Sequence, residues 1–209
     1  MLRAFIMDID PITRSRLETW ALRPVSYSQL SSWDYDKEKW YNKYIMGIEE
    51  PANPAMLFGN TVGDTLGLPH SMVPQLCEVP GIKEYKMMAN LGGITLIGYA
   101  DHYCPEKKAL NENKTSQNKK RWTKKTVEEH TQLDMYALLL FLQDKTKPDE
   151  VIMHLNYIPV IENQDFTLSL PDPIECYTFT TGRTAMDITR YANYIQNTHK
   201  EMIEYAKHR

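Results

Sequence analysis

The chain has 209 residues, of which 42% are hydrophobic and 24% charged, which is ordinary for a single globular domain spanning residues 1–209. The formal net charge of −3 argues against a protein that coats nucleic acid indiscriminately, although a local basic patch would be enough for contact with phosphates. The longest apolar run, Ala137–Leu142, is far shorter than the ~20 residues that a membrane span needs, so we expect a soluble, cytoplasmic protein.

The first part of the chain is expected to be helical after an irregular opening. A helix is predicted from about Ser26 to Met46, with a serine cap at its start and Gly47 at its end. A second helix is predicted from about Pro54, because apolar side chains then recur at a spacing of four.

The pattern changes to that of strands at Ile82. β-Branched residues near the Gly92–Gly93 turn predict a hairpin whose second strand runs to Asp101. The segment Lys108–Lys114 is predicted to form the next strand, and Val151–Ile161 alternates as a strand further along the chain.

Two more helices complete the predicted order, a strong one from about Thr126 to Gln143 and an amphipathic one over Thr184–Lys207. The sequence of elements is then helix, helix, three strands, helix, strand, helix. This order indicates an α/β fold with a mixed central β-sheet flanked by α-helices.

Two carboxylates fall opposite one another in this scheme. If the second and third strands turn about Glu106–Lys107, Asp101 lies directly opposite Glu112, with Cβ atoms ~4.5–5.5 Å apart. Like charges this close repel unless a cation or a proton lies between them. Oxygen ligands favour Mg²⁺ or Mn²⁺, and the carbonyl of Asn113 offers a further ligand.

Lys114 lies two residues beyond Glu112, on the same face of the strand. A divalent metal ion would neutralise charge on a phosphoryl oxygen and lower the pKa of a bound water, while the ammonium would orient that water or stabilise the transition state. This arrangement suits phosphodiester hydrolysis. By spacing alone the alternative is a solvated cluster of charges, because an acidic residue two positions before lysine is common.

Five stretches in order carry a wider resemblance: Ser26–Leu30, Phe58–Gly63, Gly98–Asp101, Glu112–Thr115 and Gln132–Tyr136. Together they resemble the motifs of the PD-(D/E)XK nuclease superfamily and, within it, of the RecB-like and Cas4-like branch. The resemblance implies a restriction-endonuclease-like core and a metal-dependent deoxyribonuclease, and exonucleases are common in this branch. It implies catalytic roles for Asp101, Glu112, Lys114, Gln132 and Tyr136.

Gln132 and Tyr136 lie four residues apart, on one face of a predicted helix that is otherwise apolar. They should point at the active site or a DNA phosphate, or else satisfy one another inside the protein. By resemblance, compact enzymes of this kind suit recombination, repair or end processing of linear DNA, and a phage or mobile-element origin.

The chain departs from the family pattern at Gly63, where the family usually has a metal-binding histidine. Asp64 is the expected substitute, because aspartate suits a hard cation, and His70 is a second candidate. The iron–sulfur cluster of Cas4 requires four cysteines, whereas this chain has only Cys77, Cys104 and Cys176, so no such cluster is expected.

A basic segment follows the predicted catalytic strand, with five positive charges around one tryptophan: Lys119, Lys120, Arg121, Trp122, Lys124 and Lys125. Such a segment can neutralise backbone phosphates while the indole stacks on a base. The alternatives are a solvated loop and, for the tryptophan, a place in the core.

Two other functions fit the same sequence. Gly63 would also suit a nucleic-acid-binding module whose nuclease site has decayed. The aromatic-rich first helix and the amphipathic tail would suit an interaction subunit that binds a protein partner in a recombination complex.

Overall fold

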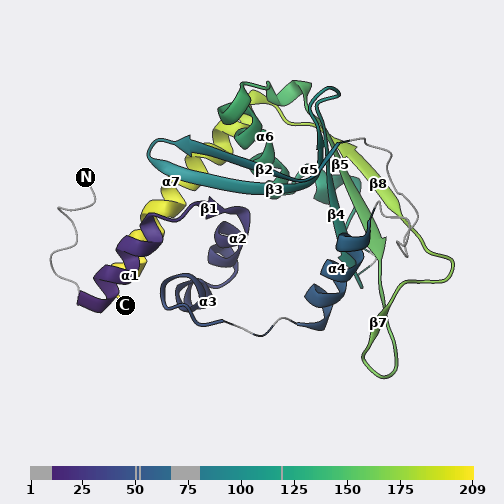
Figure 1. Cartoon of the computed structure of the whole chain (residues 1–209), viewed down its shortest axis with the longest axis horizontal. Helices are drawn as coiled ribbons and strands as arrows, with labels where there is room; N and C mark the ends of the chain where they lie inside the picture. The colour runs from purple at the N-terminus through teal and green to yellow at the C-terminus, as the bar shows by residue number, and fades with distance from the viewer. Residues whose placement is uncertain (1–10, 50, 52, 67–80, 119) are drawn as a thin grey trace.

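The computed structural model describes residues 11–49, 51, 53–66, 81–118 and 120–209. Its centre is a six-stranded mixed sheet (Figure 1). The strands of this sheet are β1 (Val25–Ser26), β2 (Ile82–Leu91), β3 (Ile94–Cys104), β4 (Ala109–Ser116), β5 (Ile152–Pro159) and β8 (Tyr177–Thr181). Two short strands, β6 (Ile161–Glu162) and β7 (Leu168–Ser169), form a separate ribbon.

The strand order is β1-β3-β4-β5-β8, and β2 pairs with the long strand β3. β3 is antiparallel to β2 and β4 and parallel to β1, whereas β4 is parallel to β5 and β5 is antiparallel to β8. The predicted α/β fold with a mixed central sheet is therefore confirmed. The last strand, β8, has no counterpart among the predicted elements.

The helices pack around this sheet. They are α1 (Pro11–Ala21), α2 (Tyr27–Tyr35), α3 (Lys37–Trp40), the π-helix η2 (Tyr41–Ile45), α4 (Pro54–Thr65), α5 (Lys124–Glu128), α6 (Thr131–Asp144), the short 3-10 helix η3 (Pro148–Glu150) and α7 (Ala185–Lys207). None of the helices in the described part of the chain combines the length and apolarity that crossing a membrane requires.

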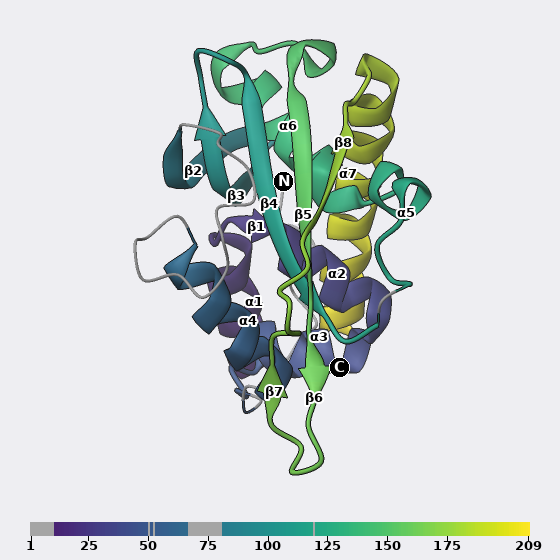
Figure 2. The ribbon, with the colours of Figure 1, turned by 90° about the vertical axis from the view of Figure 1, so that its right-hand side faces the viewer.

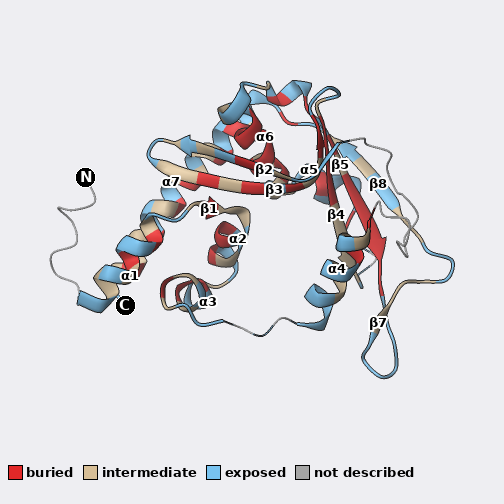
Figure 3. Cartoon of the chain, in the orientation of Figure 1, coloured by how far each residue is buried: buried red, intermediate tan, exposed pale blue. Residues whose placement is uncertain are grey.

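Opposite faces of β4 carry different helices (Figure 2). Tyr136 of α6 reaches Glu112, whereas a Cβ built on Gly59 of α4 would approach the side chain of Thr115. Residues three apart on a strand point to opposite faces, so α6 and α4 lie on opposite sides of β4. Buried residues colour much of α6 and β5 in Figure 3, which places the main core beside the Glu112 face.

Several predicted boundaries are wrong for local reasons. The helix expected from Ser26 to Met46 is divided at Asp36, whose side chain accepts hydrogen bonds from the first amides of α3. The helix expected from Thr126 to Gln143 is divided at His130, between α5 and α6. The opening, predicted as irregular, contains α1 from Pro11 onward.

The aromatic first helix and the amphipathic tail both have partners inside the fold. Trp33 and Trp40 are buried and meet edge to face, with ring centroids 5.0 Å apart. The tail forms α7, which buries Ile195 and Met202 in the main core. Packing within the chain therefore explains the two features that had suggested a protein-interaction subunit.

Candidate active site

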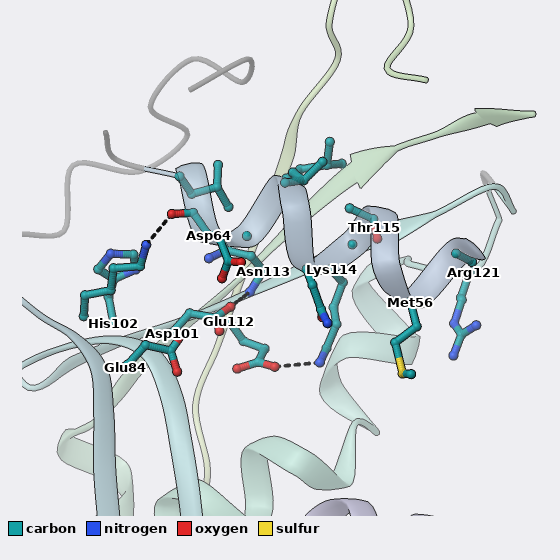
Figure 4. A pocket seen from close by; sticks show the side chains of 18 of the residues that line it. Met56, Asp64, Glu84, Asp101, His102, Glu112, Asn113, Lys114, Thr115 and Arg121 are labelled. Carbon is teal, nitrogen blue, oxygen red and sulfur yellow. Dashed lines mark hydrogen bonds and ion pairs between the residues drawn. The ribbon is translucent and has the colours of Figure 1, made fainter. Parts of the chain in front are cut away.

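The two predicted carboxylates meet where β3 passes β4. The hairpin pairs His102 with Asn111, and continuing this register by one residue places Asp101 beside Glu112, as the sequence predicts. The link is direct, because the main-chain N–H of Asn113 donates a hydrogen bond to Asp101 Oδ2 at 2.6 Å (Figure 4).

Glu112 is buried, at 4% exposed, and each of its carboxylate oxygens has a hydrogen-bond partner. Lys114 Nζ donates to Oε1 at 2.6 Å, and the Tyr136 hydroxyl lies 3.1 Å from Oε2. The same hydroxyl lies 2.6 Å from the Tyr99 carbonyl and accepts a hydrogen bond from Gln132 Nε2 at 2.6 Å. All five predicted catalytic residues therefore converge, with Gln132 acting on Glu112 through Tyr136.

Burial and like charge shift the acidity of this cluster. Burial, with a further contribution from Glu112, raises the pKa of Asp101 to about 7, while the Asn113 amide and Lys114 oppose the change. Burial, again with Glu112, raises the pKa of Tyr136 well above its ordinary value, so its hydroxyl keeps its proton. The site therefore disfavours a second negative charge unless a cation compensates it.

The main-chain carbonyl of Asn113 points to the same edge of β4 as Asp101. The side chain of Asn113 is turned away, because its Oδ1 accepts a hydrogen bond from Asn156 Nδ2 at 2.9 Å. The N–H and C=O of one strand residue point to the same edge, and the Asn113 N–H points to Asp101. The oxygens of Asp101, Glu112 and the Asn113 main chain are donors that suit Mg²⁺ or Mn²⁺.

Asp64, the other predicted ligand, lies on α4 and lines the same cavity. Its main-chain oxygen accepts a hydrogen bond from Lys83 Nζ at 2.8 Å. Within the described residues, no three or more His, Cys, Asp or Glu side chains are close enough to hold a metal ion together. A Cβ built on Gly63 meets nothing within 4 Å, so the position at which the resemblance led us to look for a histidine faces open space. His70 lies outside the described residues.

Glu84 of β2 is a cavity residue that the sequence interpretation missed. β2 pairs Lys83 with His102 and Tyr85 with Ala100, so Glu84 lies across from Asp101, and its charge contributes to raising the pKa of Asp101. Its backbone has a φ of 51°, an unusual value for a residue other than glycine. The Gly92–Gly93 turn fixes this register, so the same counting that paired Asp101 with Glu112 could have found it.

The cavity has a volume of about 550 Å³ and reaches from these carboxylates to the basic segment, where Arg121 lines it (Figure 4). Lys120, Lys124 and Lys125 are exposed, and the last two each have a glutamate one helical turn away, at 4.0 and 3.9 Å. Lys119 lies outside the described residues.

Trp122 does not have the free ring that was expected of it. It is 8% exposed, and its ring packs edge-on against His130 at a centroid distance of 4.9 Å. Trp122 therefore belongs to the core, as the second interpretation of this residue predicted, because its indole packs against His130 in the turn between α5 and α6. Of the cysteines, Cys104 and Cys176 are free thiols, and Cys77 lies outside the described residues.

No protein-family model matches the sequence, and no curated protein is similar to it. A solved structure of a proposed exonuclease from Eubacterium rectale superposes with a TM-score of 0.55 at 14% identity, over 93% of this chain and 84% of the other. The chain has the restriction-endonuclease-like fold.

Two further exonuclease structures are similar over most of the chain. A phage-related exonuclease from Haemophilus somnus gives a TM-score of 0.48 at 15% identity, over 92% of this chain and 90% of that one. An alkaline exonuclease from Laribacter hongkongensis gives 0.47 at 16% identity, over 91% and 96%. At 14% identity the Eubacterium rectale structure establishes the fold alone.

Proposed function

We propose that this protein is a deoxyribonuclease that hydrolyses phosphodiester bonds with the help of Mg²⁺ or Mn²⁺. The observation that carries the proposal is the partly buried cluster of Asp101, Glu112 and Lys114, in which two carboxylates face one another beside a single ammonium group. A structural ion pair would need only one of those carboxylates. The second acid, with its raised pKa, is explained by a cation that binds between them.

Each side chain has a task in this reaction. Asp101, Glu112 and the Asn113 carbonyl would hold the ion, and Asp64 is proposed as a ligand from the α4 side of the cavity. The bound ion would neutralise charge on the phosphoryl oxygen and lower the pKa of a water molecule. Lys114 places a proton donor beside the reacting phosphate, where negative charge grows in the transition state.

Gln132 and Tyr136 are proposed as positioning residues. The Tyr136 hydroxyl bridges Glu112 and the Tyr99 carbonyl, and Gln132 Nε2 donates to that hydroxyl. This chain of contacts fixes the carboxylate orientation, as second-layer hydrogen bonds do at metal sites. The pair also supports assignment to the RecB-like branch of the PD-(D/E)XK superfamily.

We further propose that the enzyme is an exonuclease acting on linear DNA in the cytoplasm, in recombination, repair or end processing, with a phage origin and a recombination partner as further expectations. The basic segment supports a nucleic-acid substrate, since Arg121 reaches the cavity of the carboxylates. The Eubacterium rectale protein with the same fold is itself a proposed exonuclease.

A decayed nuclease that only binds nucleic acid is the second candidate. Gly63 and the lack of a three-ligand group among the described His, Cys, Asp and Glu residues favour it. The two candidates differ in cleavage, which is directly measurable.

The deciding experiment compares end-labelled linear DNA with closed circular DNA, in Mg²⁺, Mn²⁺ or EDTA. Glu112→Gln keeps the size of the side chain and removes its charge, and we expect cleavage to fall by at least about 10³-fold. The matched control is Glu106→Gln, at the exposed turn of the same hairpin, which should cleave like wild type. Survival of circles would identify an exonuclease. Wild-type protein that binds DNA but cleaves none in either metal would favour the decayed site.

A further inference from the structure

A second cavity of about 490 Å³ lies beside the edge strand β8, and its lining is largely aromatic. Four rings border it, with one basic and one acidic residue: Trp122, Tyr157, Tyr177, Phe179, Lys124 and Glu175. Its volume falls in the usual ~300–1,000 Å³ range of small-molecule sites. None of these rings contributes to the carboxylate cluster.

The aromatic cavity lies in line with the catalytic lysine. β4 pairs Lys114 with Tyr157 of β5, and β5 pairs Tyr157 with Tyr177 of β8. Directly paired residues on neighbouring strands project from the same face of a sheet. The two tyrosines therefore continue the row of Lys114 outward to the edge of the sheet.

The basic segment borders both cavities. Arg121 lines the cavity of the carboxylates, and the next residue, Trp122, lines the aromatic cavity together with Lys124. A polynucleotide strand that lay against this segment would have its phosphates beside positive charge at both cavities.

The tyrosine rings form a fixed platform. Tyr157 is 3% exposed, and its hydroxyl lies 3.3 Å from the Ser116 carbonyl oxygen, to which it donates. Tyr177 is 47% exposed, and its ring lies near parallel to that of Tyr157, at 22° with centroids 6.0 Å apart. Its hydroxyl donates to Glu175 Oε2 at 3.2 Å. An exposed ring held in this way needs little ordering before a base stacks on it.

Charge decides which part of a nucleotide fits. Glu175 repels a phosphate from the aromatic cavity, whereas the exposed Lys124 of the same lining and Arg121 of the neighbouring cavity attract phosphates. The aromatic rings are thus suited to a base, and the basic segment that borders both cavities is suited to the backbone.

We propose that the aromatic cavity is a stacking subsite for one base of the single-stranded DNA that extends from the active site. This proposal rests on the proposed nuclease function. The DNA strand would leave the active site over the row of Lys114, Tyr157 and Tyr177. Stacking on a ring is tolerant of sequence, so the subsite would hold any base.

The test is equilibrium binding in EDTA, so that no cleavage occurs, measured by fluorescence anisotropy of a labelled twelve-nucleotide oligothymidylate and of an abasic strand of equal length. Wild type should bind the oligothymidylate more tightly. Tyr177→Ala should weaken that binding about 5- to 100-fold and leave binding of the abasic strand unchanged. Tyr177→Phe should retain the preference, because it keeps the ring.

Tyr35→Ala removes an 84% exposed tyrosine of α2 and is the matched control, expected to bind like wild type. The subsite is refuted if Tyr177→Ala binds both strands as the control does, if it weakens both equally, or if wild type does not distinguish them. Because the assay needs no cleavage, a wild-type protein that prefers bases but never cuts DNA would refute the nuclease and keep the subsite.

Discussion

Helix α6 contacts two groups of charges that are partly buried and that differ in how they are built. At Asp134 it receives the guanidinium of Arg183, which is 4% exposed. Arg183 also donates to the main-chain oxygens of Gly182 and His130, at 2.8 and 3.0 Å. Two residues further along α6, Tyr136 contacts the acidic cluster, where two carboxylates share one lysine.

The two groups differ in how their charges are balanced. Asp134 has a guanidinium partner, whereas Asp101 and Glu112 have one ammonium group between them. Burial raises the pKa of Asp134 and Asp187 adds to the rise, but Arg183 opposes it through both its charge and its hydrogen bond. At Asp101 burial and a like charge act together, and the pKa reaches about 7. Breaking the first group should therefore weaken the fold, whereas removing a charge from the second should strengthen it.

The largest stability effect is expected for Arg183→Met. Removing one partner of a buried ion pair leaves Asp134 uncompensated, and we expect the free energy of unfolding to fall by about 3–5 kcal/mol. Urea denaturation measures this directly. The double variant with Asp134→Leu should recover much of the loss, and equal stability of single and double variants would contradict the account.

Asp101→Asn should act in the opposite direction. The pKa of Asp101 is about 7 in the folded protein, against an ordinary value of 3.8. The unfolded chain therefore releases this proton more readily, so the wild-type protein loses stability as the pH rises from ~4 to ~7. In EDTA at pH 8 the variant should be more stable by about 2–4 kcal/mol, yet inactive as a nuclease.

The gain from Asp101→Asn should shrink toward zero as the pH is lowered to ~4, where the carboxyl is protonated in wild type as well. Thermal unfolding of both proteins across this range gives the comparison. A variant that is less stable than wild type at pH 8 would mean that Asp101 serves the fold rather than the site.

The smallest effect is expected for Tyr136→Phe, which keeps the ring and removes the hydroxyl between Glu112 and the Tyr99 carbonyl. We expect a loss of about 1 kcal/mol in stability and cleavage about 10-fold slower, since the carboxylate is less firmly oriented. Unchanged cleavage would show that Lys114 alone orients Glu112.

The cluster of Asp101, Glu112 and Lys114 could be predicted from the sequence because its geometry is local. A short turn at Glu106–Lys107 fixes which residues of the two strands lie opposite, so Asp101 and Glu112 follow from counting. Glu84 was within reach of the same method at the Gly92–Gly93 turn, but no motif drew attention to it.

The remaining features depend on contacts distant in sequence. Arg183 meets Asp134 across 49 positions, and no local pattern marks either residue as half of a buried pair. The burial of Trp122 depends on His130, at a helix break that periodicity does not reveal. The row from Lys114 to Tyr177 exists only because β8 joins the sheet, and that strand was not among the predicted elements.

The turn between β3 and β4 limits which insertions and deletions the active site can tolerate. Surface turns usually tolerate insertions and deletions, but one residue added at Glu106–Lys107 would slip the hairpin register and turn the β3 carboxylate to the opposite face. Two added residues would keep the face and separate the carboxylates along the strands. Among active relatives, the length of this exposed turn should therefore vary less than its composition.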